Sequence, residues 1–450
     1  MDNRAPTSVR LTCARLPRLS AEYVRLSFGN REQDGAERIR PGPTGGRKRI
    51  RRSTARRAVP AGRAATAAAR RRLPVKFRVE RDVLAEAVAW AARSLPARPP
   101  VPVLAGLLLT AQEGALALSG FDYEVSARVE LEADVEEAGT VLVSGRLLND
   151  ISRNLPNRPV EISTDGARVS VVCGTSRFTL PTLPVDEYPA LPQMPTATGT
   201  VPGDVFASAV SQAAVAAGRD DTLPVLTGVR VEINGSGITL AATDRYRFAV
   251  RELLWKPEQD DINAVALVPA KTLQDIAKSL GSGDQVTIAL SAGGAGEGLI
   301  GFEGAGRRTT TRLLEGEFPK FRSIFPTEFS AVAAVQTQPF LEALKRVSLV
   351  AERNTPVRLN FEQGVLTLEA GSGDDAQATE RIDADLEGDD ISIAFNPGYL
   401  EEGLKAIDAA YAQLSFTTPT KPALLTGKPA VDAESDEAYQ YLIMPVRLSG

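Results

Sequence analysis

The chain has 450 residues, enough for two to four domains, and its 43% hydrophobic and 24% charged residues are typical of a globular protein. It contains no histidine, which argues against the common serine and cysteine nucleophile systems and against most zinc and iron sites. No run approaches ~18 apolar residues, so no membrane span is predicted, and only two cysteines, Cys13 and Cys173, indicate a reducing cytoplasm without a disulfide framework.

The net charge of −4 divides into +14 over residues 1–74 and −18 over residues 75–450. The first segment carries runs such as Arg47-Lys48-Arg49 and Arg70-Arg71-Arg72 without apolar periodicity, so we expect a basic, disordered leader. It lacks the apolar core of a signal peptide. Three interpretations remain open: a nucleic-acid-binding arm, a targeting segment, or upstream DNA translated because the start was placed too early.

From Phe77 onward four features recur in the same order at a spacing of about 125 residues. The first is an amphipathic helix, in which apolar residues repeat with helical period. We expect these helices at residues 79–95, 204–217 and 338–351. The second is a strand that begins with Val-Pro or a similar pair and returns through a Gly-containing turn. These strands are predicted at residues 101–104, 223–226 and 355–358.

The third feature is a strand followed by a second helix, predicted at residues 145–154, 270–280 and 398–409. The fourth is a closing pair of strands, predicted within residues 160–180, 286–314 and 413–448. The repeat predicts an α+β fold of three similar domains with largely antiparallel sheets. The expected boundaries are 1–74 for the leader and 75–197, 198–328 and 329–450 for the domains.

Several short segments of these domains are distinctive: Lys76-Phe77-Arg78-Val79, Arg98-Pro99-Pro100-Val101-Pro102, Ala242-Thr243-Asp244-Arg245-Tyr246-Arg247, Glu317-Phe318-Pro319-Lys320-Phe321 and Met444-Pro445-Val446-Arg447-Leu448. Through them the chain resembles the bacterial DNA polymerase III beta subunit, the beta sliding clamp, over residues 75–450. Members of that family usually begin Met-Lys-Phe, and Val75-Lys76-Phe77 stands in that place. A valine-type start codon would explain this, so we favour mis-assigned translation for the leader.

The resemblance implies three clamp domains with sheets outside and helices lining a central pore, closed by a second copy into a head-to-tail ring. It also implies a non-catalytic processivity factor, without cofactor or metal, that acts in the cytoplasm at the nucleoid. Helix geometry supports the ring independently. Six helices spaced roughly 10 Å apart leave a hole of about 9 Å, whereas twelve leave about 28 Å, enough for a duplex roughly 20 Å across.

A ring that slides along double-stranded DNA needs a modest basic lining and no base-reading pattern. Basic residues lie on the polar faces of the predicted helices, and the resemblance adds Arg98 and Arg219. The predicted DNA contacts are Arg98, Arg146, Arg153, Arg219, Lys271, Lys278, Lys345, Arg346 and Lys405. The loop at residues 218–223 departs from relatives that have aromatic and glutamine residues there.

The family binds the polymerase III alpha subunit, clamp-loader subunits, other DNA polymerases and repair proteins through short peptides. The resemblance implies a groove between the second and third domains made of Leu226, Thr243, Arg245, Tyr246, Arg247, Phe248, Pro319, Ser323, Ile324, Leu442, Met444, Pro445, Val446 and Arg447. Relatives often have leucine where this chain has Phe248, and Ser449-Gly450 extend past the usual end. On residue type alone, Leu226, Phe248 and Ile324 could equally be core residues. The implied dimer interface comprises Arg177, Phe178, Leu180, Leu349 and Val350, of which the strand residues could also face the core.

Two patterns resemble other sites. Residues 296–301 fit G-x-G-x-x-G but precede a β-rich stretch, so we interpret them as a hairpin. Asp374-Asp375 and Asp389-Asp390 are interpreted as solvated turn residues rather than metal ligands. Two further hypotheses remain: a peptide-binding scaffold that never contacts DNA, and an enzyme acting on polysaccharide or phosphate through paired carboxylates.

Overall fold

The computed structural model describes residues 74–291, 298–351, 355–371 and 376–447. The chain divides into two compact units, residues 1–66 and 67–450, and every described residue belongs to the second. The predicted leader therefore lies outside the described residues except for Pro74. Within the described ranges, no helix is both long and apolar enough to cross a membrane.

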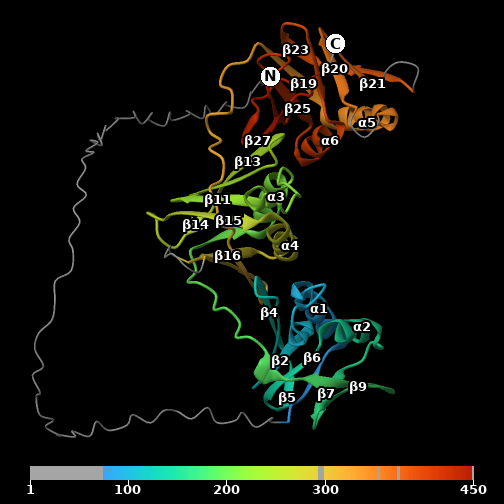
Figure 1. Ribbon diagram of the computed structural model, residues 1–450, viewed down its shortest axis with the longest axis vertical. Coiled ribbons are helices and arrows are strands. Elements are labelled where there is room, and N and C mark those ends of the chain that lie inside the picture. The colour runs from blue at the N-terminus through green and yellow to red at the C-terminus, as the bar shows by residue number, and fades with distance from the viewer. Residues whose placement is uncertain (1–73, 292–297, 352–354, 372–375, 448–450) are drawn as a thin grey trace, which may run out of the picture. The chain divides into compact units, whose positions relative to one another are not determined.

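The described residues form three copies of one unit, each built as strand, helix, five strands, helix and three strands (Figure 1). Copy 1 contains β1 (Lys76–Val79), α1 (Arg81–Ala91), β2 (Gly106–Gln112), β3 (Ala115–Phe121), β4 (Val125–Glu132), β5 (Asp134–Glu137), β6 (Gly139–Ser144), α2 (Gly145–Asn154), β7 (Val160–Asp165), β8 (Arg168–Cys173) and β9 (Ser176–Leu183).

Copy 2 contains β10 (Gly199–Pro202), α3 (Gly203–Ala214), β11 (Gly228–Asn234), β12 (Gly237–Thr243), β13 (Arg247–Leu254), β14 (Lys256–Pro257), β15 (Asn263–Pro269), α4 (Ala270–Leu280), β16 (Gln285–Leu290), β17 (Leu299–Gly304) and β18 (Arg307–Arg312). Copy 3 contains β19 (Ala331–Gln336), α5 (Thr337–Val347), β20 (Val357–Glu362), β21 (Val365–Ala370), β22 (Ala378–Asp383), β23 (Asp385–Gly388), β24 (Ile391–Phe395), α6 (Pro397–Ala406), β25 (Tyr411–Phe416), β26 (Ala423–Lys428) and β27 (Asp436–Ile443). The predicted threefold α+β repeat is confirmed.

Three details of the prediction were wrong. The first helix of copy 1 begins at Arg81, because residues 76–79 instead pair as β1 with β5 and β7. The proline-led segments of copies 1 and 2 are not strands but 3₁₀ turns, Pro102–Ala105 and Pro224–Thr227. Proline favours the first position of a helical turn because its φ angle is already helical and because the N–H that it lacks would have no hydrogen-bond partner at that position. Each copy ends in three strands rather than two.

Each copy folds into two sheets, and neighbouring copies share one of them. In copy 1 the order of strands is β5-β1-β7-β8-β9 in one sheet and β6-β2-β3-β4 in the other, and the corresponding strands of copies 2 and 3 follow the same two orders. Strand β18 of copy 2 pairs with β4 of copy 1, and β27 of copy 3 pairs with β13 of copy 2. Hydrogen-bonded sheets therefore cross both joints between copies.

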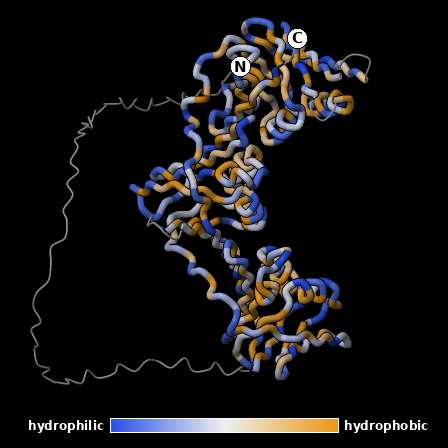
Figure 2. The backbone as a smooth tube through the Cα atoms, viewed as in Figure 1, coloured by the Kyte–Doolittle hydropathy of each residue, from blue (hydrophilic) through white to orange (hydrophobic). Residues whose placement is uncertain are grey.

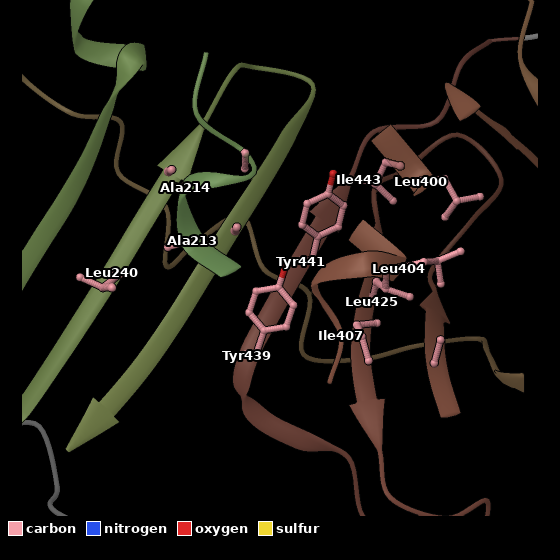
Figure 3. Close-up of a cluster of buried hydrophobic side chains, with 14 of the residues drawn as sticks. Ala213, Ala214, Leu240, Leu400, Leu404, Ile407, Leu425, Tyr439, Tyr441 and Ile443 are labelled. Carbon is pink, nitrogen blue, oxygen red and sulfur yellow. The ribbon is translucent and has the colours of Figure 1, made fainter. Parts of the chain in front are cut away.

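The cores lie between helices and sheets, and apolar and polar residues alternate along the elements (Figure 2). Copy 1 has its own apolar core, whereas one continuous cluster extends through copies 2 and 3. Figure 3 shows part of that cluster, with Tyr439 and Tyr441 of β27 between Ala213 and Ala214 of α3 and the leucines of α6. This packing, like the shared sheet, ties copy 3 to copy 2.

Candidate functional site

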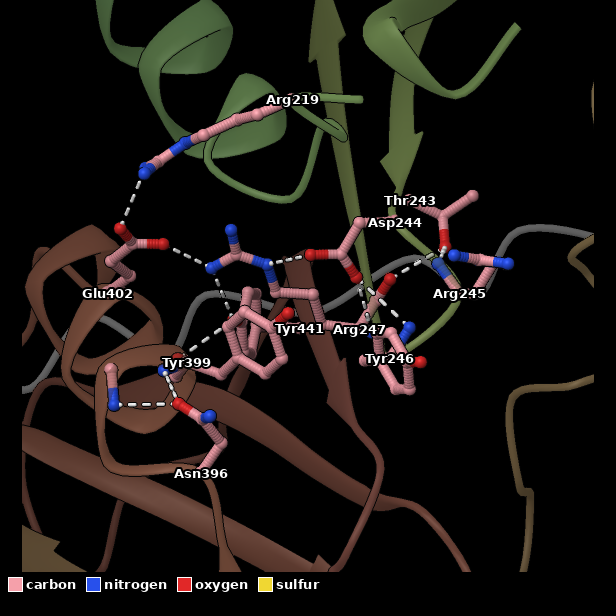
Figure 4. A network of polar contacts seen from close by, with 11 residues as sticks. Arg219, Thr243, Asp244, Arg245, Tyr246, Arg247, Asn396, Tyr399, Glu402 and Tyr441 are labelled. Atoms are coloured by element: carbon pink, nitrogen blue, oxygen red, sulfur yellow. Dashed lines mark hydrogen bonds and ion pairs between the residues drawn. The ribbon is translucent and has the colours of Figure 1, made fainter. Parts of the chain in front are cut away.

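A cavity of about 560 Å³ opens where copies 2 and 3 meet. Four segments supply its walls: residues 217–220 after α3, residues 223–226, the turn between β12 and β13, and the first turns of α6. Figure 4 shows polar residues from three of them. The α6 segment is fixed by Asn396, whose side chain accepts hydrogen bonds from the backbone N–H groups of Gly398 and Tyr399. Pro397 follows at the first helical position, so this helix start is specified by sequence.

Arg247 lies at the bottom of this cavity, and its side chain is only 3% exposed. Its Nε donates to Asp244 Oδ2 at 2.9 Å, its Nη1 donates to Glu402 and to the Tyr441 hydroxyl, and its guanidinium lies 4.5 Å from the centre of the Tyr399 ring. Burial alone would lower the pKa of Arg247, but the Tyr441 and Glu402 hydrogen bonds and the Asp244 charge outweigh burial and raise it. The group is therefore a permanent cation that links β13 to α6 and β27.

The turn before Arg247 holds two side chains out toward solvent. Asp244 Oδ1 accepts hydrogen bonds from the backbone N–H groups of Tyr246 at 3.0 Å and Arg247 at 3.1 Å. Arg245 has a positive φ of 83°, an uncommon conformation for a residue with a Cβ. As a result Tyr246 is 54% exposed and stacks against Tyr399, with ring centres 6.2 Å apart.

The predicted groove residues fall into three groups, one of which lines the cavity. Leu226, Arg245, Tyr246 and Arg247 line the cavity. The remaining surface members are exposed or half-buried: Pro319, Ser323, Ile324, Met444, Pro445, Val446 and Arg447. Thr243, Phe248 and Leu442 are buried beneath this surface, so they support it rather than line it. Phe248 packs against Phe318, Phe321 and Phe325, which accounts for the larger residue at this position.

Sequence reasoning missed the wall contributed by α6, namely Asn396, Gly398, Tyr399 and Glu402. Arg219, predicted to contact DNA, also lines the cavity, and its Nη2 lies 3.1 Å from Glu402 Oε1. The Asn-Pro pair at the start of α6 could have been recognised in the sequence as a helix start. The sequence gives no local sign that this helix start lies close to the turn between β12 and β13, about 150 residues earlier.

The helices form a contact series that runs through all three copies. Helices α1 and α2, α3 and α4, and α5 and α6 pack against each other. Residues of α1 and α4 line one cavity of about 230 Å³, and Gln212 of α3 donates to the Ala406 carbonyl at the end of α6 at 3.0 Å. Neighbouring helices therefore follow the order α2, α1, α4, α3, α6, α5, with α2 and α5 at the ends.

All nine predicted DNA-contacting cations are exposed, but they differ in their partners. Arg219, Arg346 and Lys405 form ion pairs with carboxylates, and Arg146 donates to the carbonyls of Pro96 and Ala97. The other five have no ion-pair partner among the described residues: Arg98, Arg153, Lys271, Lys278 and Lys345. These five keep their charges available for phosphate groups.

The predicted dimer residues lie on β9 and directly beyond α5. On β9, Arg177 and Phe178 are exposed, whereas Leu180, on the same face of the strand as Phe178, is 1% exposed and belongs to the core of copy 1. Beyond α5, Leu349 is 84% exposed and Val350 is half-buried.

Family models for the three domains of the DNA polymerase III beta subunit match residues 75–192 (N-terminal domain), 200–320 (central domain) and 322–447 (C-terminal domain). The chain belongs to this family. It is a beta sliding clamp, a non-catalytic accessory subunit that serves as processivity factor of DNA polymerase III.

The beta sliding clamp of Streptomyces coelicolor is 80% identical over 376 residues, which are 84% of this chain and all of that protein. A clamp homologue from Streptomyces muensis, GriR, is 54% identical over 83% of this chain and 99% of its own length. Among solved structures, the Bacillus subtilis clamp matches with a TM-score of 0.77 at 27% identity over 83% of this chain and 100% of that one.

Both misleading patterns lie only partly within the described residues. Of the G-x-G-x-x-G segment, residues 296–297 lie outside the described residues, and the rest enters the β17–β18 hairpin, as interpreted from sequence. Asp374-Asp375 also lie outside the described residues, whereas Asp389-Asp390 are exposed between β23 and β24. In the described part of the chain, no group of three acidic or cysteine side chains is arranged to hold a metal ion.

Proposed function

We propose that this clamp works as a ring of two copies, joined head to tail, that encircles duplex DNA and holds partner proteins at the groove between copies 2 and 3. The observation that carries the proposal is that both joints within the chain are built in the same way, and the two ends of the chain retain the elements for a third such joint. The domain boundaries 75–197, 198–328 and 329–450 fit this scheme.

At each internal joint the last strand of one copy pairs with the fourth strand of the preceding copy, β18 with β4 and β27 with β13. The strands left over are β9 at one end and β22 at the other. Among the described residues, β22 pairs only with β21, and β9 pairs with β8 and, at Thr182 and Leu183 alone, with β6. Pairing β9 of one chain with β22 of another would repeat the internal joint.

The helices support the same joint. At each internal joint the first helix of one copy lies near the second helix of the next: α1 and α4 line one cavity, and α3 donates a hydrogen bond to the end of α6. The helices left over are α5 and α2. Leu349 beyond α5 is 84% exposed and Leu147 of α2 is 44% exposed, as expected if they meet a second copy.

Two chains would supply twelve helices, and the spacing argument gives a hole of about 28 Å. Arg98, Arg153, Lys271, Lys278 and Lys345, whose charged groups have neither an ion-pair nor a carbonyl partner among the described residues, would then face the duplex and make phosphate contacts without reading sequence. Topology rather than tight contact would retain the clamp on DNA, which suits a protein that must slide. Its place is the cytoplasm, at the nucleoid.

The groove would receive short peptides of the polymerase III alpha subunit, clamp-loader subunits, other polymerases and repair proteins. Exposed Ile324, Met444 and Val446 offer an apolar surface beside the polar cavity, and a flexible methionine suits a site that serves several sequences. A solved Pseudomonas aeruginosa clamp, with a TM-score of 0.76 and 26% identity, was bound to griselimycin, so a relative of this chain takes a ligand.

Retention on DNA tests the ring. The clamp, loaded with its clamp loader and ATP onto a nicked circular plasmid, should co-elute with the plasmid in gel filtration and should be released when the plasmid is linearised. Sedimentation should give the mass of two chains. A compact monomer, or equal retention on circular and linear DNA, would overturn the proposal.

A further inference from the structure

The joint between copies 1 and 2 contains its own cavity, of about 380 Å³, within the size range of small ligand sites. Its apolar wall includes Phe121, Tyr123, Pro189, Leu299 and Leu313. Its charged residues are Glu124, Arg312 and Glu315. None of these three has an ion-pair partner among the described residues.

This cavity occupies the position that corresponds to the groove between copies 2 and 3. In both joints an aspartate, Asp122 or Asp244, accepts two backbone hydrogen bonds in the turn before the shared strand. In both turns the next residue has positive φ, 77° for Tyr123 and 83° for Arg245.

The strand pairing fixes the correspondence residue by residue. Arg312 donates its backbone N–H to the Glu124 carbonyl at 3.0 Å, and Met444 donates to the Tyr246 carbonyl at 2.9 Å. Arg312 therefore corresponds to Met444. Three residues further along each chain segment, Glu315 corresponds to Arg447.

The two rims differ in charge, and between copies 1 and 2 the carboxylates of Glu124 and Glu315 outnumber the single cation, Arg312. Around the groove between copies 2 and 3, Arg245 and Arg447 are exposed cations. At the corresponding positions between copies 1 and 2 stand Tyr123 and Glu315, and Glu124 replaces Tyr246. The backbone of Tyr123 is strained and its side chain is 45% exposed. Its ring lies edge-on to the ring of Phe121, with ring centres 5.6 Å apart, and offers an apolar surface.

We propose that the cavity between copies 1 and 2 is a second peptide-binding site, and that it prefers a short extended peptide with a leucine or aromatic anchor beside a lysine or arginine. The anchor would pack against Tyr123, Leu299 and Leu313, and the cation would pair with Glu124 or Glu315. The groove between copies 2 and 3, whose proposed role this inference uses as its template, would prefer an acidic neighbour. One clamp would thus present two sites of opposite charge preference.

Photo-cross-linking of the full chain tests the proposal with two probes, acetyl-Gly-Arg-Leu-Bpa-Gly-amide and its Asp counterpart acetyl-Gly-Asp-Leu-Bpa-Gly-amide, where Bpa is benzoylphenylalanine. Mass spectrometry would locate the cross-links. The Arg probe should label residues 121–124, 189–192 or 299–315 about two- to fivefold more than the Asp probe, as expected for partly exposed charge pairs. The Asp probe should favour residues 245–247, 396–402 or 444–447.

Ala190→Trp, at an exposed alanine of the cavity wall, should abolish labelling between copies 1 and 2 only. Ala138→Trp, at an exposed alanine between β5 and β6, is the matched control and should change nothing. Glu124→Gln combined with Glu315→Gln should remove the preference for the Arg probe.

Labelling confined to the groove between copies 2 and 3, or labelling between copies 1 and 2 that persists in Ala190→Trp, would overturn the second site and leave the first intact. Labelling only between copies 1 and 2 would instead count against the proposed groove.

Discussion

Two tyrosines of β27 are both buried, but their hydroxyls differ. Tyr441 donates its hydroxyl to the Tyr399 carbonyl at 2.8 Å and accepts from Arg247, whereas the Tyr439 hydroxyl has no partner among the described residues. Burial raises the pKa of both phenols, so both are neutral. Because an unsatisfied buried hydroxyl is unfavourable, Tyr439→Phe should leave the free energy of unfolding unchanged or raise it, while Tyr441→Phe should lower it by about 1–3 kcal/mol. Urea unfolding of both variants measures this, and equal losses would contradict it.

Glu402 is the second carboxylate that compensates buried Arg247, and it also pairs with Arg219. Glu402→Gln leaves Arg247 with only Asp244, so we expect a loss of about 1–3 kcal/mol, less than for a fully buried pair because Glu402 is 34% exposed. Glu401→Gln, one residue earlier on α6, removes only the i,i+4 pair with Lys405 and should cost about 0.3–0.5 kcal/mol. Thermal unfolding compares the two, and indistinguishable losses would show that Glu402 has no special role.

At the scale of elements, β22 is anchored to α5 by one ion pair, in which Arg346 donates to both carboxylate oxygens of Glu380 at 2.5 and 3.0 Å. The Arg346 hydrogen bonds lower the pKa of Glu380 below its usual value. The pair therefore contributes stability above the carboxyl group's unfolded-state pKa, near 4.5, and loses it as pH falls through the lower folded-state pKa.

Hydrogen exchange of β22, corrected for intrinsic rates, should accordingly accelerate modestly between pH 6 and pH 3 in the native chain. Glu380→Gln should exchange faster at pH 6 and should lose this pH-dependent increment. If the pH-dependent increase in exchange rate persists in Glu380→Gln, it arises from other carboxylates.

The sequence predicted elements well where one face is buried and the other is exposed. Helices α2 and α4 begin and end at their predicted residues, because their apolar residues repeat with helical period. Strand β13 was missed because it lies at a joint. Its first four residues, Arg247 to Val250, are all buried, so this part of the strand does not need the alternation of apolar and polar residues that identifies a half-exposed strand. The same joint explains the incomplete site, since Glu402 and Tyr399 reach the cavity from another copy.

At the scale of the whole molecule, the decisive feature is the repetition of one joint. Two joints within the chain use the same strands and helices, and β9, β22, α2 and α5 remain available. If a second copy completes the third joint, Leu349 should lie in it, because this exposed leucine lies just beyond α5, one of the four elements left over. Leu349→Lys would place a charge in that apolar contact and should shift the assembly toward monomers.

Leu254→Lys is the matched control, because Leu254 is a similarly exposed leucine, 78%, at the end of β13 in copy 2 and away from β9, β22, α2 and α5. Sedimentation equilibrium should show at least a tenfold weaker dimer for Leu349→Lys, which corresponds to about 1.4 kcal/mol, and no change for Leu254→Lys. Retention on nicked circular DNA should fall in parallel, since an open ring cannot stay threaded. A dimer that Leu349→Lys leaves intact, or that Leu254→Lys weakens equally, would place the interface elsewhere and remove the physical basis for the ring.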